Sequence, residues 1–176
     1  MRDVNSWRWE VLTEHVIPDA SDFGKAADDI REKALSDARN QLHPLLRKVE
    51  LDRLDQRDEF LRAFKRALEQ NIARKLALWL PGVQSIFSYD ETPTENWDSS
   101  IRLLIKVPRL SKAVKVLGKT LDNSLVKSLK QLGWSRFQER QIVLEVHQVT
   151  PRELRHGLGY SAMFYAVYST PIQVWP

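Results

Sequence analysis

Hydrophobic residues recur every three or four positions along two long stretches of the chain, a spacing that predicts amphipathic helices. The first helix is expected from about Ser21 until Pro44, which interrupts or kinks it. The second is expected from about Leu54 until Pro81 and Gly82, because this pair ends helices. Its apolar stripe is continuous and must pack on a broad surface. The stripe consists of Leu54, Leu61, Phe64, Leu68, Ile72, Leu76, Trp79 and Leu80.

Shorter segments alternate between apolar and polar residues, as strands with one buried face do. Strands are expected at residues 83–89, 101–107, 142–149 and about 161–169. A further strand is expected near the N-terminus, at about residues 4–17. The strands therefore lie on both sides of the helical region in the sequence.

A third helix, expected between Ser111 and Gly133, has two chemically opposite faces. At about 100° per residue, its lysines fall within roughly a third of the circumference and face away from an apolar stripe. Ser111 is expected to cap this helix, because its hydroxyl can accept a backbone N–H of the first turn. Gly118 and the pair Asp122 and Asn123 are positions at which the helix can divide in two. The lysines are Lys112, Lys115, Lys119, Lys127 and Lys130, and the stripe is Val114, Leu117, Leu121, Leu125, Leu129 and Leu132.

The order of these elements predicts an α+β fold with a mainly antiparallel sheet and long helices packed on one face. Residues 1–176 are enough for one substantial core and too few for two independent domains, so a single domain is expected. Residues 170–176 contain two prolines and three large apolar residues, which predicts an apolar C-terminal arm. Trp7, Trp9 and Trp175 are expected to be apolar anchors, buried either in their own domain or on a neighbour.

Charge is distributed unevenly behind a net value of +4. Residues 1–99 carry 15 basic and 19 acidic side chains, residues 100–140 carry 10 and 2, and residues 141–176 carry 2 of each. A chain with an acidic half and a basic middle can bind nucleic acid through the basic part, or bind a copy of itself. Both options bear on the lysine-rich helix.

Composition excludes several classes of protein. The chain has no cysteine, which removes disulfides, thiolate nucleophiles and thiolate metal sites. No apolar stretch approaches the roughly 18 residues of a membrane span, and the N-terminus lacks the apolar run of a signal peptide. We therefore expect no membrane partner and a cytoplasmic localisation.

The chain contains no familiar catalytic or metal-binding motif. None of its histidines has another His, Asp or Glu at a spacing typical of a metal site, so no metal, cofactor or catalytic residue is expected. The histidines are His15, His43, His147 and His156.

Two polar groups remain candidates for chemistry. Glu145 and His147 share one strand face, where they can form an acid–base pair or simply a hydrogen-bonded surface. An enzyme centred on these two residues with Arg155 and His156 is the third functional possibility. The glycines that follow, Gly157 and Gly159, form a weak phosphate cradle in one interpretation and supply turn geometry between two strands in the other.

An acidic segment precedes the strand expected at residues 101–107. Its carboxylates lack the alternate spacing of a calcium loop, so we expect a solvated hairpin tip or a contact for a neighbour's lysines. The acidic residues are Asp90, Glu91, Glu95 and Asp98.

The lysine-rich helix has three interpretations. Its lysines can be a solvated surface, or they can neutralise phosphates with help from Arg136 and Arg140. Division of the helix near Gly118 and Asn123 would give a helix-turn-helix in the second case. In the third, the lysines meet the acidic half of an adjacent copy, as in a closed ring.

The order of elements between Phe60 and Tyr168 resembles that of small ring-forming proteins at the neck of tailed bacteriophages, in particular tail terminators. The resemblance rests on a helix ending at Gly82, a strand, an acidic loop, a strand ending before Pro108, a helix, and two further strands. It implies a non-enzymatic virion protein that forms a homo-oligomer and contacts other structural proteins. No individual residue role is carried over.

The sequence thus favours a non-enzymatic assembly protein that forms a homo-oligomeric ring or adaptor, such as a phage-like tail-terminator or neck component. It would be cytoplasmic during synthesis and part of the virion afterwards. The alternative is a sequence-nonspecific nucleic-acid-binding protein that uses the lysine-faced helix.

Overall fold

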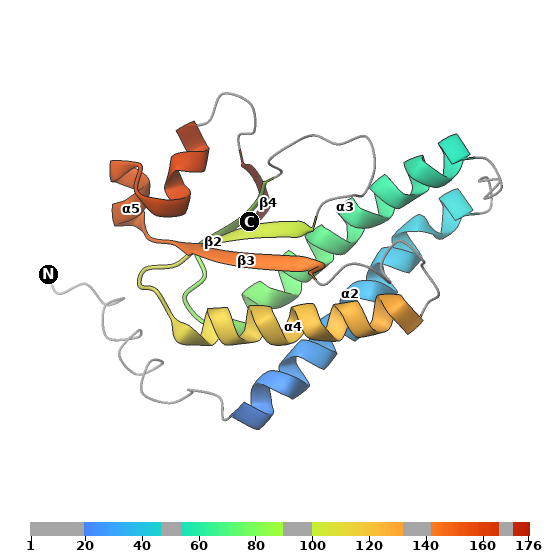
Figure 1. Ribbon diagram of the computed structural model, residues 1–176, viewed down its shortest axis with the longest axis horizontal. Coiled ribbons are helices and arrows are strands. Elements are labelled where there is room, and N and C mark those ends of the chain that lie inside the picture. Colours follow the sequence, from blue (N-terminus) through green and yellow to red (C-terminus); the bar gives the residue numbers. More distant parts are fainter. Residues whose placement is uncertain (1–19, 47–53, 90–99, 132–141, 166–170) are drawn as a thin grey trace, which may run out of the picture.

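The computed structural model describes residues 20–46, 54–89, 100–131, 142–165 and 171–176. Helices and a sheet both contribute to the fold, which confirms the α+β class (Figure 1). The strand expected at about residues 4–17, with Trp7 and Trp9, lies outside the described residues. In chain order, the elements are α2 (Ala20–Leu46), α3 (Leu54–Trp79), β1 (Ser85–Ser88), β2 (Ile101–Lys106), α4 (Lys112–Gln131), β3 (Leu144–Val149), α5 (Pro151–His156), the 3-10 helix η2 (Gly159–Tyr165) and β4 (Ile172–Trp175).

The four strands form one mixed sheet in the order β3-β2-β1-β4. β1 pairs antiparallel with both β2 and β4, whereas β2 and β3 pair in parallel. The prediction of a mainly antiparallel sheet is therefore wrong. The physical reason is the connection between β2 and β3, because α4 carries the chain back along the sheet and β3 then starts from the same end as β2.

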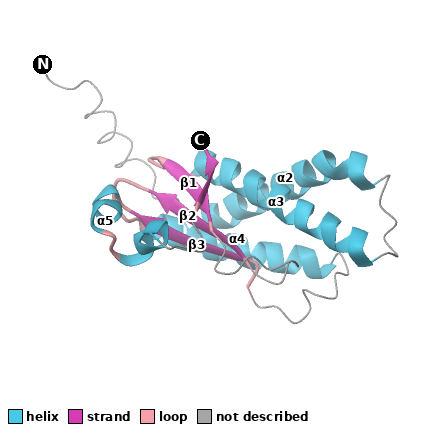
Figure 2. Cartoon of the chain, turned by 90° about the horizontal axis from the view of Figure 1, so that it is seen from above, coloured by secondary structure: helices cyan, strands magenta, loops and turns pink. Residues whose placement is uncertain are grey.

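The helices α3 and α4 cover one face of the sheet, α2 packs against these two helices, and together they enclose a single large core (Figure 2). From the sheet, Ile86, Ile101, Leu103 and Ile105 point into this core and are fully buried. The apolar residues of the three helices supply the rest, except that Trp79, predicted to belong to the stripe of α3, is 42% exposed. Within the part of the chain that is described, no helix is both long and apolar enough to span a membrane.

α2 and α3 lie side by side and begin and end close to the predicted residues (Figures 1 and 2). Pro44 lies in the last turn of α2, and the helix ends only at Leu46. Two polar contacts join the helices. Lys75 Nζ forms an ion pair with Asp37 Oδ2 at 3.1 Å, and the Trp79 indole N–H donates a hydrogen bond to the Asp29 carboxylate.

A smaller apolar cluster covers the opposite face of the sheet beneath α5 and η2. Phe87 of β1 and Phe164 of η2 meet edge to face, with ring centroids 4.8 Å apart. Residues 161–165 belong to η2, so the strand predicted at 161–169 is wrong in this part, and residues 166–169 lie outside the described chain. The buried Ser161 hydroxyl explains the difference, because it bonds to the carbonyl oxygens of Glu153 and Leu158 and folds the segment back onto α5.

The expected apolar arm at residues 170–176 contains β4, which pairs with β1 of the same chain. Trp175 lies opposite Ile86, and its side chain packs with Val174 against the main core. Ile172 at the other end of the strand is 71% exposed. Trp175 therefore has a place to bury within its own domain.

Candidate functional site

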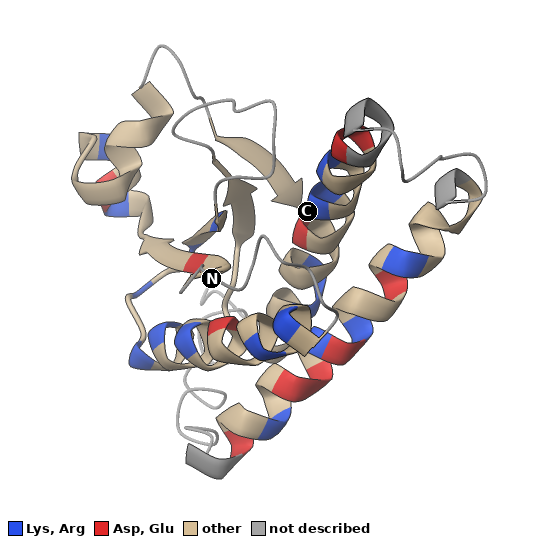
Figure 3. Ribbon diagram, turned by 45° about the vertical axis from the view of Figure 1, so that its right-hand side comes forward, with Lys and Arg blue, Asp and Glu red and all other residues tan. Residues whose placement is uncertain are grey.

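Basic residues recur along α4, where Figure 3 shows them in blue. We call their side of the helix the lysine face and define it as the exposed residues Lys112, Lys115, Lys119, Lys127 and Lys130. The opposite stripe is buried in the main core through Val114, Leu117, Leu121, Leu125 and Leu129. Leu132, predicted to extend the stripe, lies outside the described residues.

α4 is a single uninterrupted helix, so its predicted division is wrong. Two of the residues expected to break the helix, Gly118 and Asp122, instead hold it against β3. Gly118 lies so close to β3 that a Cβ there would be 2.9 Å from the Val146 Cβ. The buried Asp122 carboxylate accepts the backbone N–H groups of Val143 and Leu144 at 2.7 and 2.8 Å. Without a break near Asn123, the helix-turn-helix interpretation also fails.

The start of α4 is fixed by two side chains. The Ser111 hydroxyl accepts the backbone N–H of Ala113 at 3.2 Å, as expected of a capping residue. The Gln148 amide of β3 both accepts from the Ser111 backbone N–H and donates to the Ser111 carbonyl, each at 2.8 Å. The first turn of α4 is thereby tied to the end of β3.

A polar contact with α2 holds the middle of α4. Arg31 donates to the Ser124 hydroxyl, and Ser124 donates to Asp28, at 2.8 and 2.7 Å. Asp28 also pairs with Arg31 at 2.8 Å. Together with the capping contacts, this network gives the lysine face a rigid support.

The charge of the lysine face has no opposing carboxylate on its own helix. Asp122, the one acidic residue in α4, is buried and turned toward the backbone of β3. Among the described residues, no ion pair includes any of the five lysines. The face is therefore a strongly positive surface available to an external anionic partner.

A second polar group lies on the opposite face of the sheet. Glu145 of β3 is directly opposite Arg102 of β2 in the parallel register, and their side chains approach to 3.6 Å. His147 Nε2 lies 3.5 Å from the same carboxylate oxygen, and the Ser100 hydroxyl donates to the other at 2.8 Å. The predicted pairing of Glu145 and His147 is thus present, within a half-buried ion-pair cluster.

These contacts decide what Glu145 can do chemically. Partial burial by itself raises the pKa of its carboxyl. The hydrogen bond from Ser100 and the positive charge of Arg102 outweigh this effect. With a further contribution from His147, the pKa of Glu145 lies below its ordinary value. A carboxylate held in this way is a weak general base near neutral pH.

The lowered pKa of Glu145 predicts a pH-dependent contribution to stability. Because the folded state holds the carboxylate ionised, the contribution is present above the ordinary pKa of 4.5 and is lost as pH falls through the lower folded-state pKa. Wild type should therefore exceed Glu145→Gln in free energy of unfolding most clearly near neutrality, and the difference should shrink in acid. Urea unfolding at a series of pH values measures it.

Ser100→Ala is the matched control for this prediction. It removes one hydrogen bond to Glu145 and leaves the carboxylate in place. The variant should keep part of the pH dependence. Identical pH profiles for wild type and Glu145→Gln would contradict the assignment.

The other residues of the enzyme hypothesis lie elsewhere. Arg155 and His156 are exposed on α5, and neither shares a hydrogen bond or ion pair with the Glu145 cluster within the described chain. Gly157 and Gly159 have positive φ angles of 62° and 57°, so they supply turn geometry between α5 and η2. The described residues contain no group of three or more His, Asp or Glu side chains placed to hold a metal ion.

Several predicted site residues cannot be placed, because they lie outside the described residues. They are Asp90, Glu91, Glu95 and Asp98 of the acidic segment, Arg136 and Arg140 of the basic segment, and Trp7 and Trp9.

Sequence reasoning missed Arg102 as the neighbour of Glu145 and Tyr160 as the neighbour of His147. Arg102 could not be predicted there, because an antiparallel sheet gives no reason to pair it with Glu145, whereas the parallel pairing of β2 and β3 places the two residues opposite each other. Tyr160 precedes the strand predicted at about residues 161–169, whereas in the structure it lies on η2, and its ring centroid is 3.9 Å from that of His147. A parallel β2–α4–β3 unit would have been the signal for the first pairing.

Comparison of the chain with protein-family models, curated proteins and solved structures gives no match.

Proposed function

We propose that this chain is a non-enzymatic assembly protein that forms a homo-oligomeric ring or adaptor through the lysine face of α4. The observation that carries the proposal is the lysine face itself. It is exposed along the whole helix, and the helix supplies no opposing carboxylate. A positively charged surface attracts a negatively charged neighbour and repels a positively charged one, which favours the correct partner.

Two further features support assembly. Residues 1–99 carry the excess of negative charge that a neighbouring copy would offer to the lysines. The contacts of Ser111, Asp122 and Ser124 fix α4 against β3 and α2, so little ordering is needed when a partner binds. A rigid, charged surface of this kind is suited to repeated contacts between copies.

The particle that we propose is phage-like, with the chain at the neck or tail end. What supports this part is the order of elements from α3 to β3, which resembles that of tail terminators, whereas α5 and η2 follow where the resemblance has a further strand. The localisation would then be the cytoplasm during synthesis and the virion after assembly.

Charge reversal on the lysine face tests the proposal. The variant Lys112→Glu, Lys115→Glu, Lys119→Glu should weaken self-association at least tenfold, because like charges across an interface cost several kcal/mol. Native mass is measured by light scattering at low and high salt. Circular dichroism checks that the variant remains folded.

A matched control places the same charge change on another helix. Arg62, Arg66 and Arg74 are exposed on α3, and their replacement by Glu should leave the oligomer intact. Loss of assembly in both triple variants would point to net charge and not to the lysine face. Unchanged assembly in the α4 variant would remove α4 as the interface.

A further inference from the structure

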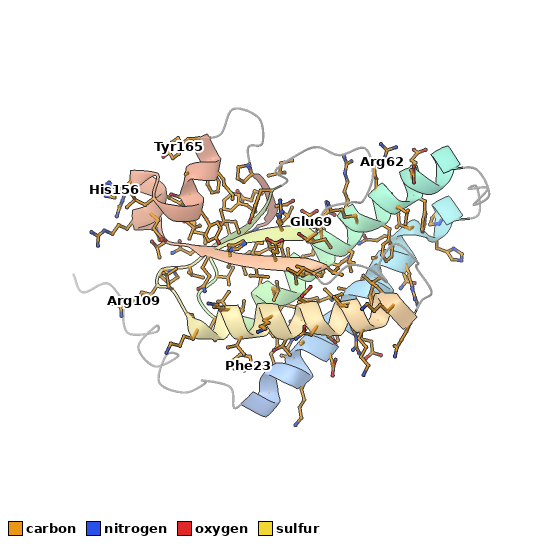
Figure 4. The ribbon with its side chains drawn as sticks, in the orientation of Figure 1. Phe23, Arg62, Glu69, Arg109, His156 and Tyr165 are labelled. Atoms are coloured by element: carbon orange, nitrogen blue, oxygen red, sulfur yellow. The ribbon has the colours of Figure 1, made fainter. Side chains whose placement is uncertain are left out.

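Basic residues from two separate parts of the chain lie at the same end of the molecule. β2 and β3 are parallel, and Lys106 at the end of β2 pairs with Val149 at the end of β3. The chain then continues into α4 from one strand and into α5 from the other. In Figure 4, Arg109 and His156 both lie at this end. We define the basic end as Lys106, Arg109, Arg152, Arg155 and His156, all of which lie outside the lysine face.

The positive charge of the basic end is barely opposed. Glu153 is the acidic residue of α5, and its Oε2 accepts both the backbone N–H and the hydroxyl of Thr150 at 2.8 Å. This carboxylate is therefore committed to the capping box of α5. Arg152 and Arg155 are exposed and have no ion pair with any other described residue. The basic end thus favours a polyanion.

Two exposed tyrosine rings stand beside these cations, both on η2. Tyr165 is 66% exposed, and its hydroxyl donates to the Leu154 carbonyl at 3.0 Å. The ring packs beside the end of α5, because a Cβ at position 157 would lie in ordinary contact with Tyr165 Cε2, at 3.5 Å. Tyr160 is 43% exposed, and its ring is held against that of His147. Both rings are therefore fixed before any ligand arrives.

We propose that the basic end and the two tyrosines of η2 bind single-stranded nucleic acid, a function beyond the assembly role. The cations would neutralise phosphates, and the fixed rings of Tyr160 and Tyr165 would stack with unpaired bases. Strand binding without sequence preference combines these two elements. A duplex offers phosphates but keeps its base faces stacked inside, so it can use only half of this surface.

The arrangement favours a nucleic-acid strand over an acidic protein segment. An unpaired strand exposes both phosphates and bases, and this surface offers cations on α5 and rings on η2. Fixing a ring in advance lowers the entropy that stacking must overcome. An acidic protein would use the charges but would give the two rings no flat partner.

Fluorescence anisotropy with labelled oligonucleotides tests the proposal on the full chain. The probes are oligothymidylate and oligouridylate of about 15 nucleotides, a length within the range of known strand-binding sites, and a mixed-sequence duplex of similar length. Titrations are run at about 50 and 200 mM salt, where phosphate contacts show their dependence. We expect the single strands to bind more tightly than the duplex and to lose affinity steeply with salt.

Variants separate stacking from charge. Tyr165→Ala should weaken single-strand binding roughly tenfold, within the range measured for one stacked base, and should hardly change duplex binding. Tyr165→Phe keeps the ring and should retain most of the affinity.

The salt slope is the fall in the logarithm of affinity with the logarithm of salt concentration, and each phosphate contact to a single strand contributes about 0.7 to it. Replacing both Arg152 and Arg155 by Gln should therefore lower the slope by about 1.4. The matched control is Arg62→Gln with Arg66→Gln on α3, outside both the basic end and the lysine face, which should leave the slope unchanged.

Two results would overturn the proposal. One is the absence of single-strand binding at low salt, which would leave the surface to a protein partner. The other is equal binding of duplex and single strand with no effect of Tyr165→Ala, because this shows charge attraction alone. Light scattering of the same samples reports assembly independently, since Arg152, Arg155 and Tyr165 lie outside the lysine face.

Discussion

Asp122→Ala is expected to lower the free energy of unfolding by about 3–4 kcal/mol, the largest effect of any single substitution considered for this chain. The carboxylate accepts two buried backbone N–H groups, those of Val143 and Leu144, where the chain enters β3. Alanine would leave both donors without an acceptor, and each orphaned donor costs about 1–3 kcal/mol. Urea unfolding followed by circular dichroism measures the loss.

Asp122→Asn is the control for this substitution. Its amide keeps one oxygen in the position that accepts both bonds, so it should lose clearly less stability than the alanine variant. A change below about 0.5 kcal/mol for Asp122→Ala would resemble an ordinary surface substitution and would contradict the buried role of this carboxylate.

Gly118→Ala is expected to destabilise the protein by about 1–3 kcal/mol, although alanine is the better helix former. The added methyl would lie 2.9 Å from the Val146 Cβ and 3.1 Å from its Cγ2. The Val146 Cβ is attached directly to the backbone of β3, so no rotamer change removes the contact. α4 must instead move away from the sheet, which loosens the core beneath the lysine face.

Gly24→Ala provides the matched comparison, because Gly24 is also helical and no atom lies within 4 Å of its ideal Cβ position. This variant should gain up to about 1 kcal/mol from helix propensity alone. Thermal or urea unfolding of both variants measures whether each substitution raises or lowers the free energy of unfolding. Stabilisation by both substitutions would show that α4 and β3 are not in close contact at Gly118.

Periodicity identified the elements whose burial follows from local sequence. α3 and the apolar side of α4 were predictable because one face of α3 from Phe60 to Leu76, and one face of α4, lie in the core. β1 and β2 were found by alternation, and Ser111 by its capping chemistry. These features depend on neighbours a few residues away, which a sequence pattern records directly.

The errors came from contacts between distant residues. Gly118 and Asp122 suggested a break in α4, since their local preferences are poor for a helix. Their partners, Val146 and the backbone of Val143, are more than twenty residues away and compensate for those preferences. Likewise, Ser161 closes a turn onto Glu153 that alternation interpreted as a strand.

The candidate sites were predictable to different extents. The lysine face follows from helical spacing alone, so its exposure could be predicted. The contact of Glu145 with His147 follows from their shared strand face, but Arg102 enters only through the parallel register of β2 and β3. The basic end was not predictable, because it depends on where two strands end relative to each other.

The parallel pairing of β2 and β3 also sets an order of folding events. Ile101 pairs with Leu144, about forty residues later in the chain, whereas α2 and α3 are neighbours both in sequence and in space. Contacts between residues distant in sequence form slowly, because the intervening chain must first lose conformational entropy. We therefore expect the α2–α3 hairpin to form early and the β2–β3 ladder to follow once α4 has docked. β4 should join the sheet last, because Trp175 pairs with Ile86 about ninety residues earlier in the chain.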